Sequence, residues 1–207
     1  MNAGPAAGAL FDISLPIAED MAVWPGDPPP VQRWLQRLAD GDDLDLSQWT
    51  LGAHTGTHLD APSHFVAGAP DVEALGLDAL VGACLVVDVA AGSLPATDTR
   101  HPRLLLKHSA GIGADLAEQL IARGVRLVGV DSLSIESAEA VEAGAPTHRA
   151  LLAAGIAILE GLVLEAVPPG EYFLVALPLR LQHTEASPVR AILFRREVPP
   201  PGARPNV

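Results

Sequence analysis

One eleven-residue segment, HTGTHLDAPSH at positions 54–64, constrains the fold of this chain more than any other part. It contains Gly56 and Pro62, two residues that disfavour a helix, so we expect the segment to be extended. On a strand, successive side chains point to opposite faces, so the even positions from 54 to 60 share one face. In a helix, positions 58 and 60 would lie about 200° apart around the axis. Only the extended conformation brings these side chains together.

The shared face carries His54, His58 and Asp60, and Gly56 leaves a gap between the two imidazoles that an ion would fill. Imidazole and carboxylate are ligands of zinc, manganese and iron, and no nearby thiolate favours a structural zinc site. The segment therefore predicts an open, catalytic metal site. The alternative is a polar strand with solvated histidines, although a chain with 7 histidines rarely places three at this spacing by accident.

Composition narrows the class of protein. The chain has 207 residues, 49% of them hydrophobic, which is enough for the core of one domain at 10–195 with loose tails at 1–9 and 199–207. The net charge of −12 argues against a nucleic-acid partner. Cys84 is the only cysteine and lies in an apolar run, so we expect a buried, inert thiol and no internal disulfide. No run reaches the roughly 18 apolar residues of a membrane span, so we expect no membrane partner and a cytoplasmic location.

Apolar runs and turn residues predict more strands than helices. Strands are expected at 11–15, 31–38, 46–51, 83–90, 104–108, 125–130, 156–164, 172–179 and 189–194. Helices are expected at 76–80, 115–123 and 148–154, the last capped by Thr147 and ended by Gly155. These elements predict an α/β domain with a mixed sheet and helices packed outside it.

Two later residues are further candidates for the metal site. Glu160 lies in a predicted buried strand, where an uncompensated charge would cost several kcal/mol. His148 opens the preceding helix. The chain rises by ~1.5 Å per residue along that helix and returns by ~3.3 Å per residue along the strand, which would bring Glu160 back near the level of His148. The pair would then meet one ion. The alternatives are an ion pair of Glu160 with Arg180 or Arg190, and a solvated His148.

The segment at 54–64 resembles the H-x-G-T-H-x-D-A-P-x-H signature of the cyclase family of metal-dependent hydrolases, whose best-known members are bacterial kynurenine formamidases. The resemblance extends over about residues 10–195. It rests on WPGD at 24–27, GVDS at 129–132, His148, ILEG at 158–161, ALPL at 176–179 and SPVR at 187–190. It implies a swivelling β/β/α-type domain, and a homodimer or homotetramer with active sites near the subunit interface.

The resemblance also implies a set of metal ligands. We expect two zinc ions per subunit, with manganese as the alternative. The implied ligands are His54 and His58 for one ion, Asp60 as a bridge, His148 for the second ion, and Glu160 as a bridge or completing ligand.

Two further roles follow from the resemblance. His64 becomes the general acid and base, a role that suits an imidazole with an unperturbed pKa of ~6.5. The alternatives are that His64 supports a ligand or is a third metal ligand. Trp24 lines the substrate pocket, or else braces the Pro-Gly turn that follows it.

The implied reaction is hydrolysis of an N-formyl aryl amine, such as N-formylkynurenine, by metal-activated water. The chain departs from the family pattern at 131–134, where it has Asp-Ser-Leu-Ser and kynurenine formamidases typically have Asp-Thr-Pro-Ser. This departure puts the accepted acyl or aryl group in doubt. Isatin hydrolases share the metal signature and open a cyclic amide, so a ring is an alternative substrate. A protein in which ions only cross-link the sheet is the non-enzymatic alternative.

Some polar residues fit no motif. Asp131, at the end of a predicted strand, either orients a ligand histidine or caps the turn that follows it. His101, His108 and His183 are expected at solvated or core positions.

Overall fold

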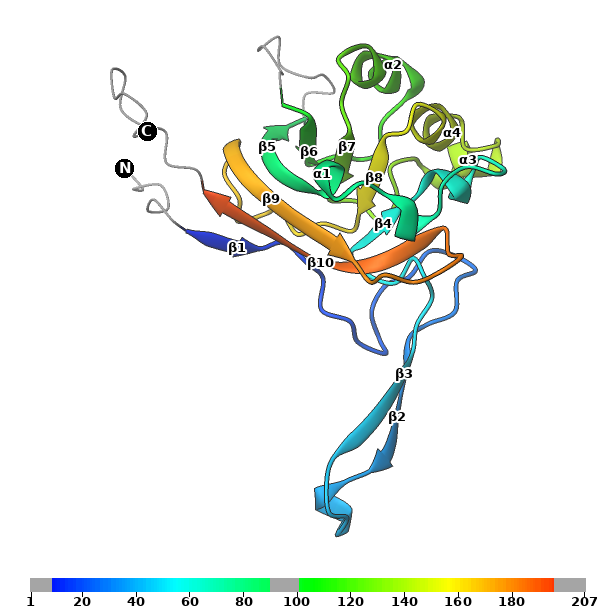
Figure 1. The fold of residues 1–207 in the computed structure, drawn as a ribbon, viewed down its shortest axis with the longest axis vertical. Coiled ribbons are helices and arrows are strands. Elements are labelled where there is room, and N and C mark those ends of the chain that lie inside the picture. Colours follow the sequence, from blue (N-terminus) through cyan, green and yellow to red (C-terminus); the bar gives the residue numbers. More distant parts are fainter. Residues whose placement is uncertain (1–8, 90–100, 196–207) are drawn as a thin grey trace.

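The computed structural model describes residues 9–89 and 101–195, and its centre is a closed β-barrel (Figure 1). Around the barrel the strand order is β10-β4-β8-β7-β6-β5-β9, and β9 pairs back with β10. Strand β1 (Leu10–Asp12) pairs with β10 outside this ring. The barrel strands are β4 (His58–Asp60), β5 (Val81–Asp88), β6 (Arg103–Lys107), β7 (Leu127–Val130), β8 (Ala157–Glu160), β9 (Gly170–Pro178) and β10 (Ala186–Arg195).

The sheet is mixed, as the sequence predicts. Strands β5 to β8 run parallel to one another, whereas β4, β9 and β10 pair antiparallel with each of their neighbours. The sequence did not predict closure, which depends on two long-range pairings at the edges of the β9–β10 hairpin, of β9 with β5 and of β10 with β4. The α/β class is therefore confirmed. The swivelling β/β/α arrangement stays a prediction.

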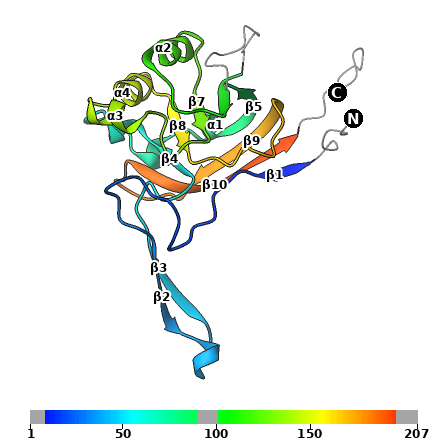
Figure 2. The same ribbon diagram turned by 180° about the vertical axis from the view of Figure 1, so that it is seen from behind.

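Side-chain alternation along the strands builds two separate cores. Leu59, Leu105 and Leu159 point into the barrel, where strands from all around the ring contribute apolar side chains. Leu104 and Ile158 point outward and are covered by helices. These are mainly α2 (Ala114–Ala122) and α4 (Pro146–Ala153), which lie together over one side of the barrel (Figure 2). The prediction of helices packed outside the sheet is confirmed.

The local elements differ from the predictions mainly at their ends. The short helix α1 (Leu77–Leu80) was expected, but α3 (Ala138–Glu142) was not. Strand β8 stops at Glu160, because Gly161 has a φ of 67° and turns the chain. The last residue of the strand expected at 83–90 and both expected tails, apart from Ala9, lie outside the described residues.

Helix α4 has an unexpected N-terminus. The prediction of Thr147 as its cap is wrong: the helix begins at Pro146, and the preceding Ala145 has a φ of 52° and makes no side-chain cap. The hydroxyl of Thr147 instead donates to the carbonyl oxygen of Ile112 at 3.2 Å. The N–H groups of Thr147 and His148, which have no acceptor within the helix, donate to a residue from another segment, Glu136.

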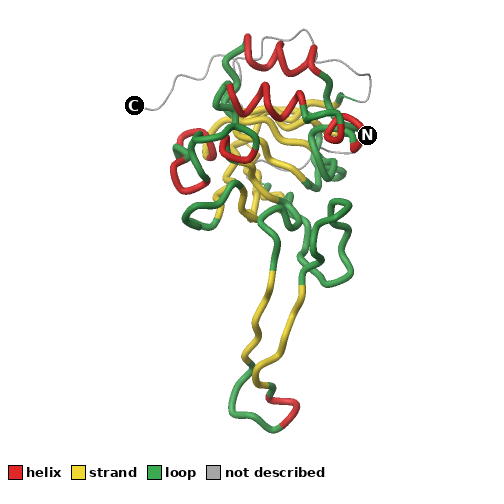
Figure 3. The backbone as a smooth tube through the Cα atoms, turned by 90° about the vertical axis from the view of Figure 1, so that its right-hand side faces the viewer, coloured by secondary structure: helices red, strands yellow, loops and turns green. Residues whose placement is uncertain are grey.

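A two-stranded arm projects from the side of the barrel away from these helices (Figures 1 and 3). It consists of β2 (Val31–Gln36) and β3 (Leu46–Thr50), which pair only with each other. Many of its apolar side chains are exposed, including Trp34 and Trp49. Within the described ranges, the helices are too short or too polar to cross a bilayer.

Candidate metal centre

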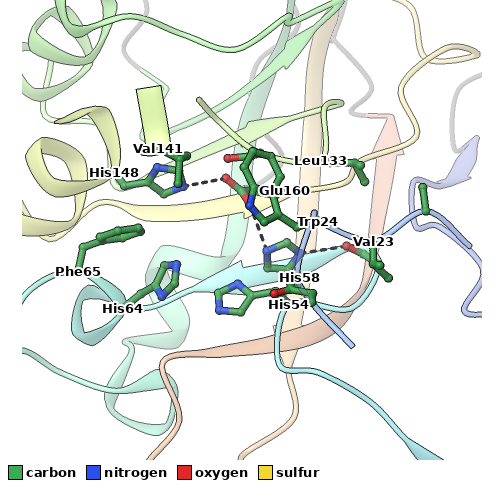
Figure 4. A pocket seen from close by; sticks show the side chains of 14 residues that line it. Val23, Trp24, His54, His58, His64, Phe65, Leu133, Val141, His148 and Glu160 are labelled. Atoms are coloured by element: carbon green, nitrogen blue, oxygen red, sulfur yellow. Dashed lines mark hydrogen bonds and ion pairs between the residues drawn. The ribbon is translucent and has the colours of Figure 1, made fainter. Parts of the chain in front are cut away.

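The pairing of β4 with β8 creates the centre. His58 and Asp60 alternate with Leu59 along β4, so Leu59 enters the barrel core while its two neighbours face outward. In the antiparallel register His58 lies directly opposite Glu160 of β8, so both side chains are on this outward face. The first turn of α4 brings His148 over the same place, and Figure 4 shows these groups facing one another.

Asp60 lies between two groups of potential ligands. Its Oδ1 is 3.0 Å from His54 Nδ1 and 3.5 Å from His58 Nε2, and its Oδ2 is 4.0 Å from His148 Nε2. Glu160 joins the groups from the other side, with 3.3 Å between its Oε2 and His58 Nε2 and 3.2 Å between its Oε1 and His148 Nε2. The structure therefore brings together all five residues that the sequence nominated as ligands.

The donor atoms fall into two overlapping sets that share Asp60. One set is His54, His58 and Asp60, and the other is Asp60, His148 and Glu160; in each, the atoms lie within 4.8 Å of one another. Three of these atoms, His58 Nε2 and both carboxylate oxygens of Asp60, are buried without a hydrogen-bond partner. Each such atom costs about 1–3 kcal/mol if nothing pairs with it. The arrangement fits divalent cations, because nitrogen and oxygen donors of this kind suit zinc and manganese.

The other ring nitrogen of each histidine has its own contact. His58 Nδ1 donates to the carbonyl oxygen of Gly56 at 3.0 Å, which leaves the lone pair of Nε2 directed at the two carboxylates. His148 Nδ1 lies 2.5 Å from Glu136 Oε2, and His54 Nε2 lies 3.5 Å from Glu185 Oε1. Such contacts fix the tautomer and orientation of a metal-binding imidazole.

The backbone of the histidine segment differs from the expected strand. Only His58–Asp60 is a strand, and the chain reaches it through turns in which Gly56 has a φ of 69°. The expected gap at Gly56 is also wrong, since a Cβ there would meet Met21 and Ile17 at 3.3 and 3.5 Å. The ligands nevertheless converge, because the turn folds His54 back toward Asp60.

The histidines and carboxylates of the cluster shift one another's pKa values. Burial lowers the pKa of His58, but Glu160 and Asp60 more than compensate and raise it to about 9. Burial raises the pKa of Glu160, whereas His148 and His58 lower it below its usual range. Without a cation, a proton on imidazole therefore balances the carboxylates, and a cation must displace that proton to bind.

A cavity of about 170 Å³ opens onto the centre. His64, on the short 3₁₀ turn η2 (Pro62–His64), has its ring centroid 4.4 Å from that of His54 and 4.2 Å from that of Phe65. Burial lowers the pKa of His64. The lining of this cavity comprises Ala22, Val23, Trp24, Asp27, His54, Gly56, His58, His64, Phe65, Leu133, Ser134, Val141, His148 and Glu160 (Figure 4).

The contacts of several other polar residues distinguish between the alternatives that the sequence leaves open. Glu160 does not pair with Arg180 or Arg190: both are exposed, and Arg190 Nε donates to Asp12 at 2.9 Å. Neither alternative for Asp131 holds: its carboxylate accepts the backbone N–H groups of residues 108 and 109 at 2.7 and 2.9 Å, in the turn after β6 and not in the turn that follows Asp131. The remaining histidines lie away from the centre: His101 contacts Glu171, His108 contacts Asp88, and His183 is exposed.

Sequence reasoning missed two acidic residues beside the centre. Glu136 is 3% exposed and contacts His148, and Glu185 contacts His54. The one available signal for Glu136 was its place directly after the apolar Ile135, which is weaker than the predicted buried strand that singled out Glu160. Glu185 carries no such signal.

Comparison with known proteins identifies relatives along nearly the whole chain. The family model described as "Putative cyclase" matches residues 11–105. Over 216 residues the chain is 38% identical to kynurenine formamidase from Salinibacter ruber (strain DSM 13855 / M31), a match that covers 93% of this chain and 100% of that protein. A solved structure of a potential metal-dependent hydrolase with cyclase activity is 34% identical, with a TM-score of 0.79 over 92% of this chain and 100% of that one.

A more distant structure shares the fold. Isatin hydrolase A from Labrenzia aggregata, bound to benzyl benzoate, is 20% identical with a TM-score of 0.74, and the match covers 91% of this chain and 94% of that one. The barrel and its cluster of imidazoles and carboxylates thus define a metal-dependent hydrolase. This chain belongs to the cyclase family, within which it is a homologue of kynurenine formamidase.

Proposed function

We propose that this protein is an amidohydrolase that cleaves the formyl amide of an N-formyl aryl amine such as N-formylkynurenine. The observation that carries the proposal is the pair of ligand groups sharing Asp60, three of whose donor atoms are buried without a hydrogen-bond partner. The 38% identity to a kynurenine formamidase supports the choice of substrate.

In this proposal, five side chains hold two divalent cations. His54 and His58 bind the first ion, His148 binds the second, Asp60 bridges them, and Glu160 bridges them or completes the second set. Zinc is the proposed metal and manganese the alternative, since both accept imidazole and carboxylate. A divalent cation in such a centre supplies a water of lowered pKa and polarises the carbonyl under attack.

His64 is the proposed general acid and base. Its ring lies between His54 and Phe65 at the cavity wall, and it belongs to neither set of candidate ligands. A lowered pKa keeps the imidazole neutral near pH 7, so it is ready to accept a proton. His64 would take up a proton from the attacking water as its oxygen bonds to the formyl carbon, and would give that proton to the aniline nitrogen as the C–N bond breaks.

The cavity walls suit an aromatic substrate. Trp24 and Phe65 offer ring faces, and Val23, Leu133 and Val141 add apolar surface. We propose that Trp24 contacts the aryl ring of the substrate. Leu133 stands where the formamidase pattern has proline, and its place in the cavity lining supports an effect of this departure on specificity. Opening of a cyclic amide such as isatin therefore stays the second candidate reaction.

A direct assay separates these candidates. The zinc-loaded protein is supplied with N-formyl-L-kynurenine and with isatin side by side, and hydrolysis is followed spectroscopically. The proposal predicts that kcat/KM is higher for the formamide. Faster opening of isatin would assign the protein to lactam hydrolysis. Failure to hydrolyse either compound would rule out both reactions and favour a binding role for the ions.

We also propose a homodimer or homotetramer in the cytoplasm. The projecting arm supports self-association, because a hairpin paired only with itself is marginally stable and exposes apolar side chains here. The single cysteine, Cys84, is buried, and a chain without disulfides fits a reducing compartment.

A further inference from the structure

Glu136 occupies an unusual position behind the second set of candidate ligands. Its carboxylate is buried between the loop after β7 and the start of α4. Oε1 accepts the backbone N–H of Thr147 at 2.8 Å, and Oε2 accepts the backbone N–H of His148 at 2.9 Å. Glu136 thus supplies the N-terminal cap that the side chains of α4 itself do not provide.

The same carboxylate also orients the imidazole of His148. Its Oε2 lies 2.5 Å from His148 Nδ1. Because a backbone N–H can only donate, both carboxylate oxygens act as acceptors, and Nδ1 must carry the hydrogen in this contact. The lone pair of the ring is then on Nε2, which lies 3.2 Å from Glu160 and 4.0 Å from Asp60.

The preceding residue fixes a second member of the same set. The backbone N–H of Ile135 donates to Glu160 Oε1 at 2.6 Å. The dipeptide at 135–136 therefore orients both His148 and Glu160. The other set is held by different groups: the carbonyl oxygen of Gly56 contacts His58, and Glu185 contacts His54. Different groups therefore orient the histidines of the two ligand sets.

We propose that Glu136 is a positioning residue for the second metal ion, acting through His148 and leaving the first ion unaffected. This inference rests on the metal centre proposed above. In this proposal the binding of the second ion depends on the buried carboxylate of Glu136, in the loop between β7 and α3, whereas the binding of the first ion does not. Removal of such a partner weakens metal binding by about 10–100-fold.

The test compares the metal-free wild-type chain with Glu136→Gln, which keeps the size of the side chain and removes its charge. Each protein is titrated with Zn²⁺ by calorimetry, and its metal content is measured by elemental analysis. The wild type is expected to bind two ions. Glu136→Gln is expected to bind the first with unchanged affinity and the second about 10–100-fold more weakly. Glu142→Gln, an exposed residue of α3, removes the same charge and is expected to match the wild type.

Imidazole ¹⁵N NMR of the zinc-loaded proteins supplies a readout that a purely structural role would not change. In the wild type, His148 is expected to carry its hydrogen on Nδ1, and in Glu136→Gln that signal is expected to weaken or broaden. Glu136→Asp keeps the charge and shortens the side chain, so partial recovery of the second ion is expected. It also replaces Glu136→Gln if the latter does not fold.

The outcomes separate this inference from the proposed function. If the wild type binds two ions and Glu136→Gln binds both with unchanged affinity, the inference is overturned and the metal centre stands. Equal weakening of both ions in a cooperatively folded variant also overturns it, because the supports would not be separate. If the wild type takes up no ion, the proposed centre fails, and the role of Glu136 fails with it.

Discussion

At the scale of single residues, His64 is the sharpest test of the chemistry. Replacing it by alanine removes the proposed proton carrier, so kcat should fall by about 10²–10⁴-fold. Metal content should stay the same, because His64 belongs to neither candidate ligand set. Elemental analysis and steady-state kinetics on one preparation check both expectations. His101→Ala, far from the centre, is the control.

Two results would contradict this assignment. Loss of an ion in His64→Ala would make the residue a ligand, and unchanged turnover would remove it from the mechanism.

Cys84 offers a residue-scale test of the barrel core. Burial raises the pKa of its thiol to about 12, so at pH 8 the thiol outnumbers the thiolate by about 10⁴ to one. We expect no reaction with a thiol reagent such as DTNB in the native state and complete reaction after unfolding in urea. Rapid modification of the native protein would contradict the burial of Cys84.

How much of the site the sequence predicts depends on how local each contact is. His54, His58 and Asp60 lie within seven positions, so their closeness in sequence was enough to group them, although a turn and not the expected strand brings His54 to Asp60. His148 and Glu160 needed an estimate of helix and strand rise, and the 3.2 Å between His148 Nε2 and Glu160 Oε1 confirms their approach. Glu136 escaped prediction because its contact with His148 forms only when the loop after β7 packs against the start of α4.

At the scale of elements, the turn after β8 packs against the carbonyl group that orients His58. Gly161 has a φ of 67°, and a Cβ there would lie 2.6 Å from the carbonyl oxygen of Gly56, the acceptor for His58. Gly161→Ala should therefore destabilise the protein and weaken binding of the first ion. Gly155 has a φ of 74° and open space around it, so Gly155→Ala isolates the backbone strain, about 1 kcal/mol.

Urea unfolding of the two alanine variants measures the difference. The clash should make Gly161→Ala less stable than Gly155→Ala by about 1–3 kcal/mol. Equal free energies of unfolding would show that the Gly56 carbonyl moves aside without cost.

Strand positions were easier to predict than strand partners. Apolar runs at 83–90, 104–108 and 125–130 indicated buried strands, which the structure contains as β5, β6 and β7. Closure of the barrel was not predictable in this way, because the pairings of β9 with β5 and of β10 with β4 join residues far apart in the chain. Helix α3 was missed because five residues are too few for a clear helical period.

At the scale of the whole molecule, the arm exposes apolar side chains that a single chain does not bury. Gln32 pairs with Trp49 and Trp34 pairs with Ser47, so both tryptophans lie on one face of the hairpin, 42% (Trp34) and 39% (Trp49) exposed. Tryptophan is enriched at the energetic centres of protein interfaces. Light scattering after size-exclusion chromatography should therefore find a dimer or tetramer at micromolar concentration.

A double variant tests whether the arm makes that interface. Trp34→Ser with Trp49→Ser should shift the protein toward monomer while the barrel stays folded. Leu77→Ser, which replaces an exposed apolar residue of α1, should leave the assembly unchanged. A monomeric wild type would contradict the proposed oligomer.

The central claim is that the imidazoles and carboxylates around Asp60 hold divalent cations that hydrolysis of the formamide requires. The most direct test measures turnover of N-formyl-L-kynurenine by the whole protein before chelation, after complete removal of metal, and after addition of Zn²⁺ or Mn²⁺. Activity should vanish with the metal and return when either ion is restored. Undiminished turnover by protein that elemental analysis finds free of metal would contradict the account.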